Sequence, residues 1–260
     1  MRHLILALEA PLMAFGGETI DARGVIRWFP AASMLTGLFG NALGWRREEH
    51  ERHQRLQDRL VFAARIDREP VGSSRMTDFQ TARLRADDRG WTTRGAPEGR
   101  GGAPGTYNAP HLRYRDYFAD MRVVVALRLE PDDETPELDA LASALQEPER
   151  PLFIGRKSCL PTVPLFAGFG EADTCLTALL AWPLGEGPAA TPSYPENRRL
   201  LWPDGEGSES VTASHSYLLT DQRNWRTGLH GGGRIVCEGA VSHDMFVPSA
   251  GSPGSQQAGG

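Results

Sequence analysis

Aliphatic residues gather in short runs that predict strands at three points along the chain. The runs cover residues 3–9, 60–66 and 121–129, and the last of them is rich in valine. Runs of this length are shorter than most helices, and β-branched residues favour strands. We therefore expect strands at these three places, with the first of them buried.

Other stretches have the wider apolar spacing of helices. Ser33 is a suitable N-cap for an apolar helix over 34–43, whose two interior glycines require a close neighbour. Residues 46–59 form a charged amphipathic pattern, and 136–146 predict a further helix. Residues 16–29 contain three glycines and are interpreted as a loop.

The order of these elements is strand, helix, strand, arginine-rich insertion, strand, helix, strand. It is the β-α-β-β-α-β order of ferredoxin-like domains, which RNA-recognition modules also use. We therefore expect an α+β fold, with a modified ferredoxin-like domain over 1–168 and the insertion at the position of a hairpin. A Pro-punctuated strand should end near Phe166. Beyond it, we expect a loop over 183–210 and a small β-rich C-terminal extension over 169–247, followed by a flexible tail over 248–260.

The insertion has a composition of its own. Residues 75–115 contain eight arginines against four acidic residues, and 90–110 are rich in glycine and proline without apolar periodicity. Such a segment cannot bury a core, so it should project into solvent or onto a partner. Trp91 and Tyr107 could stack on bases, at about 1–3 kcal/mol each. A solvated loop anchored by its own aromatics is the alternative.

Composition excludes several classes of protein. No apolar run approaches 18 residues, so no membrane-spanning helix is expected. Three widely spaced cysteines form neither a disulfide framework nor a zinc knuckle, and they fit a reducing cytoplasm. The net charge of −5 hides a split, because residues 1–128 carry +5 and residues 129–260 carry −10. Any interaction with nucleic acid must therefore come from a local basic patch.

The sequence Gly155-Arg156-Lys157-Ser158 is the sharpest local candidate for such a patch. A glycine that exposes backbone N–H groups, followed by two cations and a hydroxyl, can hold a phosphodiester. The alternative is an ordinary basic turn, and the spacing of a P-loop is missing. The amides at the start of the helix at Ser33 are a second candidate for a phosphate, with tight helix packing as the alternative.

Catalytic patterns are weak. His111, Tyr114 and Lys157 could form a metal-independent ribonuclease, with one group deprotonating a 2′-hydroxyl and another protonating the leaving oxygen. His50 and His53 share a helix without a third metal ligand, and Ser158-Cys159 lacks a nucleophile elbow. We expect no metal and no cofactor.

Five segments, in order along the chain, carry a resemblance to a known family. They are LILALEAPL at 4–12 with Phe15-Gly16, FPAAS at 29–33 with GLFGNALG at 37–44, DFQT at 78–81, RDYFAD at 115–120 with VVVAL at 123–127, and PLFIGRKSC at 151–159. Together they resemble the CasD family of subunits of the type I-E CRISPR surveillance complex Cascade, within the repeat-associated RNA-binding superfamily. Ala31, Met34 and Thr77 depart from the family pattern.

The resemblance implies a non-catalytic subunit that holds the 5′ handle of the crRNA, with the insertion, about 78–112, as an extended β-hairpin thumb. It implies a CasC-type backbone subunit, a CasA-type large subunit and, through the assembled complex, target DNA as partners. On this basis the expected RNA contacts are Gly155, Arg156, Lys157, Ser158, Ser33, Arg27, Arg115 and Tyr114, and the expected thumb contacts are Arg83, Arg85, Arg89, Arg94 and Arg100.

Two alternatives stay open at this point. In type I-C relatives the corresponding subunit cuts the repeat RNA itself, which makes a metal-independent endoribonuclease the competing function. A binding domain of the same fold that takes no RNA is the third possibility.

Overall fold

The structure is a computed structural model that describes residues 1–20, 22–70, 75–82, 90–91, 97–98, 110–184 and 197–246. Its helices are α1 (Ala32–Ala42), α2 (His50–Arg59), α4 (Leu138–Gln146) and α5 (Cys175–Ala181), with a 3₁₀ turn at His243–Phe246. Its strands are β1 (Arg2–Met13), β2 (Gly16–Ile20), β3 (Arg23–Ile26), β4 (Leu60–Arg68), β5 (Arg75–Ala82), β6 (Gly90–Trp91), β7 (Pro97–Glu98), β8 (His111–Leu129), β9 (Phe166–Glu171), β10 (Asn197–Pro203), β11 (His215–Arg223) and β12 (His230–Ser242).

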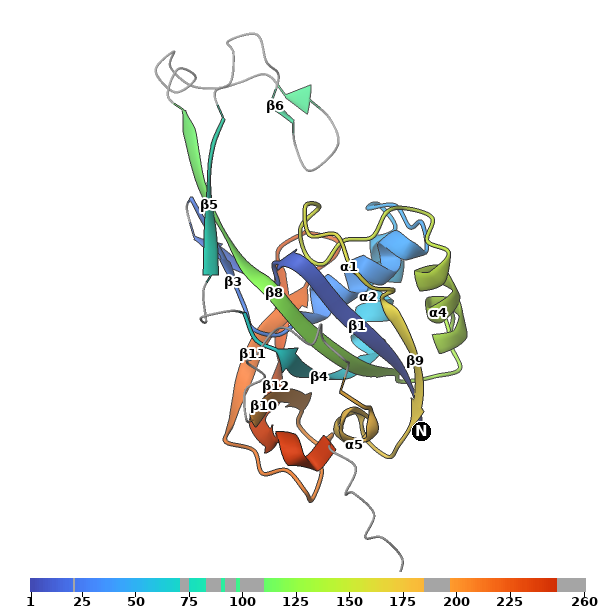
Figure 1. Ribbon diagram of the computed structural model, residues 1–260. Coiled ribbons are helices and arrows are strands. Elements are labelled where there is room, and N and C mark those ends of the chain that lie inside the picture. The colour runs from blue at the N-terminus through green and yellow to red at the C-terminus, as the bar shows by residue number, and fades with distance from the viewer. Residues whose placement is uncertain are drawn as a thin grey trace, which may run out of the picture.

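One large sheet organises the described chain (Figure 1). Its strand order is β11-β12-β10-β4-β8-β1-β9, and β2, β3 and β5 join at the side, where β3 and β5 pair with β8. The pairs are antiparallel except β3 with β8. The fold is therefore a mixed, β-rich arrangement with few helices.

The central strands are buried on both faces because helices cover both sides of the sheet. Val123, Val125 and Leu127 of β8 pack into a core with α1 and α4, while Val124 and Ala126 pack into a second core with α5. Successive side chains of a strand point to opposite faces, so a continuous apolar run fills two cores. The predictions of strands at 3–9, 60–66 and 121–129 are confirmed.

Helix α1 begins differently from the expectation. Its N-cap is Ala31, whose own side chain forms no cap hydrogen bond, so the prediction of Ser33 as N-cap is wrong. The carboxylate of Asp221 in β11 accepts a hydrogen bond from the backbone N–H of Ala32 at 3.1 Å. A residue far along the chain therefore caps this helix, which local sequence could not indicate.

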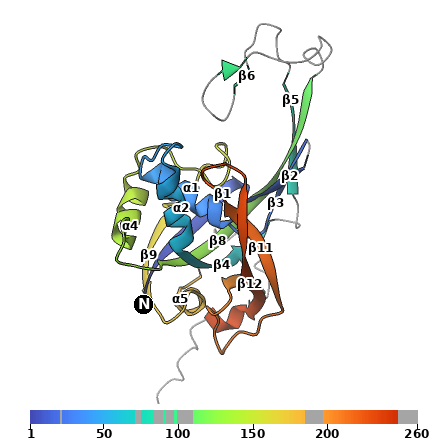
Figure 2. The ribbon, with the colours of Figure 1, turned by 180° about the vertical axis from the view of Figure 1, so that it is seen from behind.

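The glycine-bearing face of α1 has the close neighbour that its sequence requires. A Cβ atom at Gly40 would lie 2.5 Å from Nε2 of His53 in α2, and one at Gly37 would lie 3.6 Å from the ring of Trp225. Trp225 lies in the turn between β11 and β12, and its ring stacks on His53 at 4.6 Å. Figure 2 shows α1 and α2 beside this hairpin. Packing explains Gly40, whereas a Cβ atom at Gly37 would make ordinary van der Waals contact with Trp225.

Strand β8 is longer than its apolar run, because it extends on the N-terminal side of Asp120 as a ribbon with β5. Asp120 has φ +54°, and the guanidinium of Arg68 binds both its carbonyl and its carboxylate, at 2.9 and 2.8 Å. Residues 111–118 of β8 pair with 75–82, and the ribbon extends away from the body in both views (Figures 1 and 2). The five thumb arginines, Arg83, Arg85, Arg89, Arg94 and Arg100, lie outside the described residues.

Several predicted elements differ from the structure. The expected loop at 16–29 contains the paired strands β2 and β3, and the expected loop at 183–210 contains β10. The strand expected before Phe166 is absent from the described chain, since 151–165 form turns and β9 begins at Phe166. Strand β9 pairs with β1 and β10 pairs with β4, so both strands belong to the large sheet. Tertiary pairing decides these strands, and their sequences alone are ambiguous.

The described helices include none that is both long and apolar enough to cross a membrane. The three cysteines are free.

Candidate nucleic-acid interface

The Gly155–Ser158 segment forms a closed loop against the end of β1. The Ile154 N–H donates to the Cys159 carbonyl at 2.7 Å, and the Cys159 N–H donates to the Arg156 carbonyl at 2.8 Å. Gly155 has φ +88°, and a Cβ atom there would lie 1.9 Å from the carbonyl oxygen of Ala14. The glycine is required by this backbone contact, which holds the loop in one position.

Arg156 fastens the loop to two strands. Its Nη1 donates to the Asp116 carbonyl of β8 at 2.7 Å, its Nη2 donates to the Gly24 carbonyl of β3 at 3.0 Å, and its guanidinium lies 4.6 Å from the ring centre of Tyr117. The planar fork of arginine serves two acceptors and a ring face at once. Arg156 therefore holds the loop in position and also gives it a positive charge.

Lys157 and Ser158 are the exposed residues of the loop. Lys157 has no hydrogen bond or ion pair with any residue that the structure describes, so its ammonium is free for an external anion. Burial raises the pKa of the Cys159 thiol, and the neighbouring Arg156 and Ser158 oppose the rise. A buried, protonated thiol is a poor nucleophile, which agrees with the absence of an acyl-transfer motif.

Arg115 lies beside Arg156. A Cβ atom at Gly24 would come within 2.6 Å of Nη1 of Arg115 and 3.1 Å of Nη2 of Arg156, so both guanidiniums lie over this glycine. Asp78 stands opposite Arg115 in register, but its carboxylate accepts a hydrogen bond from the Gln80 side chain at 2.6 Å. Arg115 forms no ion pair with a described carboxylate. Arg115, Arg156 and Lys157 thus make a positive patch, which we call the loop patch.

Tyr114 lies on the other face of β8, because it neighbours Arg115 in a strand. Its ring packs on Phe79 of β5 at 5.1 Å, and the guanidinium of Arg23 lies 5.4 Å from its centre. Phe79 is 53% exposed. The expected RNA-binding set is therefore divided between the two faces, and Phe79 and Arg23 are surface residues that sequence reasoning missed.

Arg27 belongs to a separate cavity of about 240 Å³, beside the start of α1. Arg199 closes one side of it, with its guanidinium 4.6 Å from the Trp28 ring and 2.8 Å from a Glu238 carboxylate oxygen. Burial, together with Glu238, raises the pKa of Tyr217. Sequence reasoning missed Trp28, Arg199 and Tyr217, since β10 and β11 bring them together from distant segments.

Ser33 lies close to this cavity, in the first turn of α1. The backbone N–H of Ala32 there already donates a hydrogen bond to the Asp221 carboxylate. That carboxylate is itself paired with Arg234 at 3.0 Å, and the phosphate at this helix end stays a prediction. Larger cavities of about 570 and 520 Å³ contain none of the predicted site residues.

The three candidate ribonuclease residues do not converge. His111 and Tyr114 lie three positions apart on β8, so their side chains face opposite sides. His111 shares the face of Arg115 but is four residues further along the strand, about 13 Å away. Lys157 belongs to the loop patch.

Comparisons with known proteins agree on one relationship. The family model described as CRISPR-associated protein (Cas_Cas5) matches residues 3–237. The CRISPR system Cascade subunit CasD of Escherichia coli (strain K12) is 30% identical over 190 residues, which cover 70% of this chain and 78% of the relative.

Solved structures show the same fold. A chain of a CRISPR RNA-guided surveillance complex superposes with a TM-score of 0.59 at 23% identity, over 92% of this chain and 89% of that one. A chain described as a Cas protein superposes with a TM-score of 0.58 at 22% identity, over 94% and 97% of the two chains.

Proposed function

The chain belongs to the CRISPR-associated Cas5 family, and from this premise we propose that it is the crRNA-binding subunit of a type I-E Cascade complex. In this role it caps the 5′ handle of the crRNA and does not cut it. The observation that carries the proposal is the loop patch. Lys157 has no partner among the described residues and follows Arg156, whose guanidinium lies with that of Arg115 over Gly24 and bonds the Asp116 carbonyl. A single-stranded handle offers phosphates and splayed bases to such a surface.

The proposed architecture follows from strand order. The order β9-β1-β8-β4, with α1 and α4 packed in the same core, supports a modified ferredoxin-like domain. The β5–β8 ribbon supports an extended β-hairpin thumb, with Tyr114 and the exposed Phe79 available to stack on bases. Residues 169–247 are the proposed C-terminal extension.

The proposed partners follow from the family. A relative is a Cascade subunit, so we place this chain beside a CasC-type backbone subunit and a CasA-type large subunit, with target DNA bound through the assembled complex. Antiviral DNA targeting in the cytoplasm is the setting, and three free cysteines suit that compartment.

Binding of handle RNA to the reconstituted complex tests the site. Lys157→Ala should weaken handle binding and lower the slope of log Kd against log salt concentration by about 0.7, the value for one phosphate contact on a single strand. Arg226→Ala is the matched control, because Arg226 is exposed and its side chain has no partner among the described residues. Equal affinities and slopes for both variants would refute the assignment.

The competing function is metal-independent cleavage of repeat RNA. Incubation of the purified chain with repeat RNA in EDTA distinguishes the two, and we expect intact RNA. Specific cleavage that disappears in His111→Ala would overturn the non-catalytic role.

A further inference from the structure

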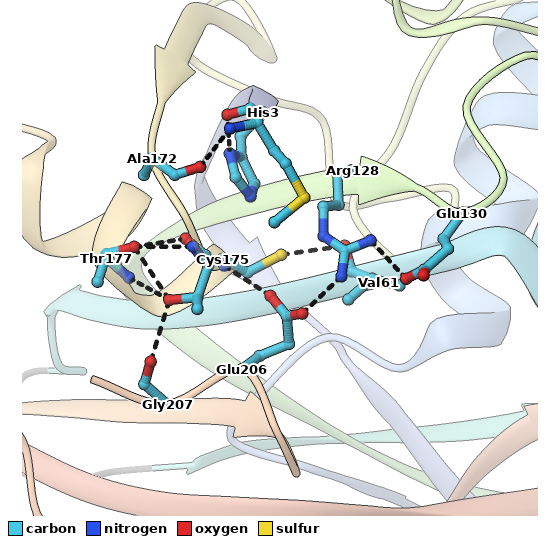
Figure 3. Close-up of polar contacts among 11 residues, drawn as sticks. His3, Val61, Arg128, Glu130, Ala172, Cys175, Thr177, Glu206 and Gly207 are labelled. Atoms are coloured by element: carbon cyan, nitrogen blue, oxygen red, sulfur yellow. Dashed lines mark hydrogen bonds and ion pairs between the residues drawn. The ribbon is translucent and has the colours of Figure 1, made fainter. Parts of the chain in front are cut away.

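A second cluster of chemically active side chains lies far from the loop patch, inside the protein. His3 of β1, Cys175 at the start of α5 and Glu206 after β10 are all buried, with exposed fractions of 0%, 0% and 9%. One donor atom from each lies within 4.8 Å of the other two. Figure 3 shows the three side chains with their polar contacts.

His3 has a nitrogen that nothing satisfies. Its Nδ1 lies 3.0 Å from the Met1 carbonyl, an acceptor, so Nδ1 carries the hydrogen and Nε2 keeps a lone pair. Burial lowers the pKa of His3, which favours this neutral form. Nε2 is buried without a hydrogen-bond partner among the described residues, and the ring points toward Cys175 and Arg128 (Figure 3). A buried nitrogen without a hydrogen-bond partner lowers the stability of the fold by about 1–3 kcal/mol unless a ligand binds to it.

The other two donors each keep a free lone pair. Glu206 accepts from the Cys175 N–H at 2.8 Å and from Arg128 at 2.6 Å, one bond for each carboxylate oxygen. The Cys175 thiol donates to the Val61 carbonyl at 3.4 Å. Both groups are therefore oriented by the backbone and by neighbouring side chains, as ligands of structural metals are.

We propose that His3, Cys175 and Glu206 form a site for one divalent zinc ion. An imidazole nitrogen, a thiolate and a carboxylate are the donors that zinc takes, and the His3 Nδ1–H bonded to a carbonyl is the outer contact typical of such ligands. A water molecule would complete four-fold coordination.

The charges around the cluster nearly balance this ion. Arg128 is paired with both Glu206 and Glu130. With zinc bound and Cys175 ionised, Zn²⁺ and Arg128 bring three positive charges against three negative ones from Cys175, Glu206 and Glu130, and the N-terminal ammonium of Met1, which acts on His3, adds a fourth positive charge. Burial raises the pKa of the Cys175 thiol, so binding must release the thiol proton to solvent, and affinity should rise with pH.

The three ligands would join segments that are distant in sequence. The ion would fasten α5 and the turn after β10 to the first strand of the sheet. Arg128 and Glu130, which are paired next to the cluster, line a cavity of about 520 Å³, whereas the three donor residues do not line it. The site thus has a structural role, independent of RNA.

Metal binding by the tag-free full chain tests the proposal. After dialysis against EDTA, we expect native mass spectrometry to find about one Zn²⁺ per chain on readdition. Co²⁺ should give a thiolate charge-transfer band in the wild-type chain, a readout that needs no variant. Cys175→Ser and His3→Gln should each weaken zinc binding by about tenfold or more in competition with a chromophoric chelator.

Matched controls replace a buried thiol and a buried imidazole outside the cluster. Cys159→Ser and His53→Gln should bind zinc as the wild type does, with circular dichroism confirming that each variant is folded. Absence of stoichiometric zinc and of the Co²⁺ band in the wild-type chain would overturn the proposal and leave water as the partner of His3. Equal loss in the control variants would overturn it as well.

Discussion

Replacing Arg156 separates its positioning role from its charge. Arg156→Lys keeps the cation but cannot donate to the Asp116 and Gly24 carbonyls while lying over Tyr117. Arg156→Ala removes the charge as well. If the loop patch depends on the position of the loop, the lysine variant should lose most of the RNA affinity that the alanine variant loses.

The structure sets the size of the effect on stability. A hydrogen bond from a charged donor contributes about 1.5–3 kcal/mol, and a cation–π contact at a partly exposed site about 0.5–1 kcal/mol. Since Arg156 is half-buried, the lower values apply, and Arg156→Ala should cost about 3 kcal/mol. Arg156→Lys, which keeps one bond, should cost about half of that.

Urea unfolding and handle binding in the reconstituted complex measure the two effects. With a slope of about 3 kcal/mol per molar urea, the midpoint for Arg156→Ala should fall by about 1 M. Arg226→Ala serves as the control for removal of a cation. A lysine variant that binds RNA as the wild type does, together with an alanine variant of unchanged midpoint, would refute the positioning role.

Four further variants test packing and protonation by urea unfolding. Gly155→Ala should destabilise by about 2–4 kcal/mol, because its Cβ would overlap the Ala14 carbonyl at positive φ; Gly16→Ala, with nothing within 4 Å, should change stability by less than about 0.5 kcal/mol. Asp221→Ala should cost about 3–5 kcal/mol, because it uncaps α1 and leaves Arg234 unpaired; a loss below about 1 kcal/mol would contradict this. Burial lowers the pKa of His53 from 6.5, so the unfolded chain binds that proton more tightly and stability should fall as pH drops below 6.5. His53→Gln should flatten that dependence, leaving the part due to His3, and an unchanged pH profile would contradict the sign.

The central strands could be predicted because burial on both faces leaves a continuous apolar run. The ribbon half of β8 could not, since Asp120 interrupts the apolar pattern and residues 111–116 are mostly polar or charged. Strands β3 and β10 are similar, because their pairing with β8 and β4 selects a conformation that their sequences leave open.

The candidate site was only partly predictable. The Gly155–Ser158 motif indicated a basic loop, and Lys157 is exposed on it. The carbonyl partners of Arg156 come from two other strands, and the Asp221 cap comes from a third. Tyr114 and Arg115 are adjacent in β8 and therefore point to opposite faces. The sequence would have predicted this if the predicted strand had begun at His111. No spacing motif in the sequence indicates the cluster of His3, Cys175 and Glu206, because its residues come from three distant segments.

A cryo-electron microscopy map of the reconstituted complex with bound crRNA would locate the 5′ handle on this subunit. We expect density for the 5′-terminal nucleotides, with a phosphate against Lys157 and Ser158 and within reach of Arg115. A handle that contacts other surfaces, with the Gly155–Ser158 loop facing solvent or a protein subunit, would contradict this expectation.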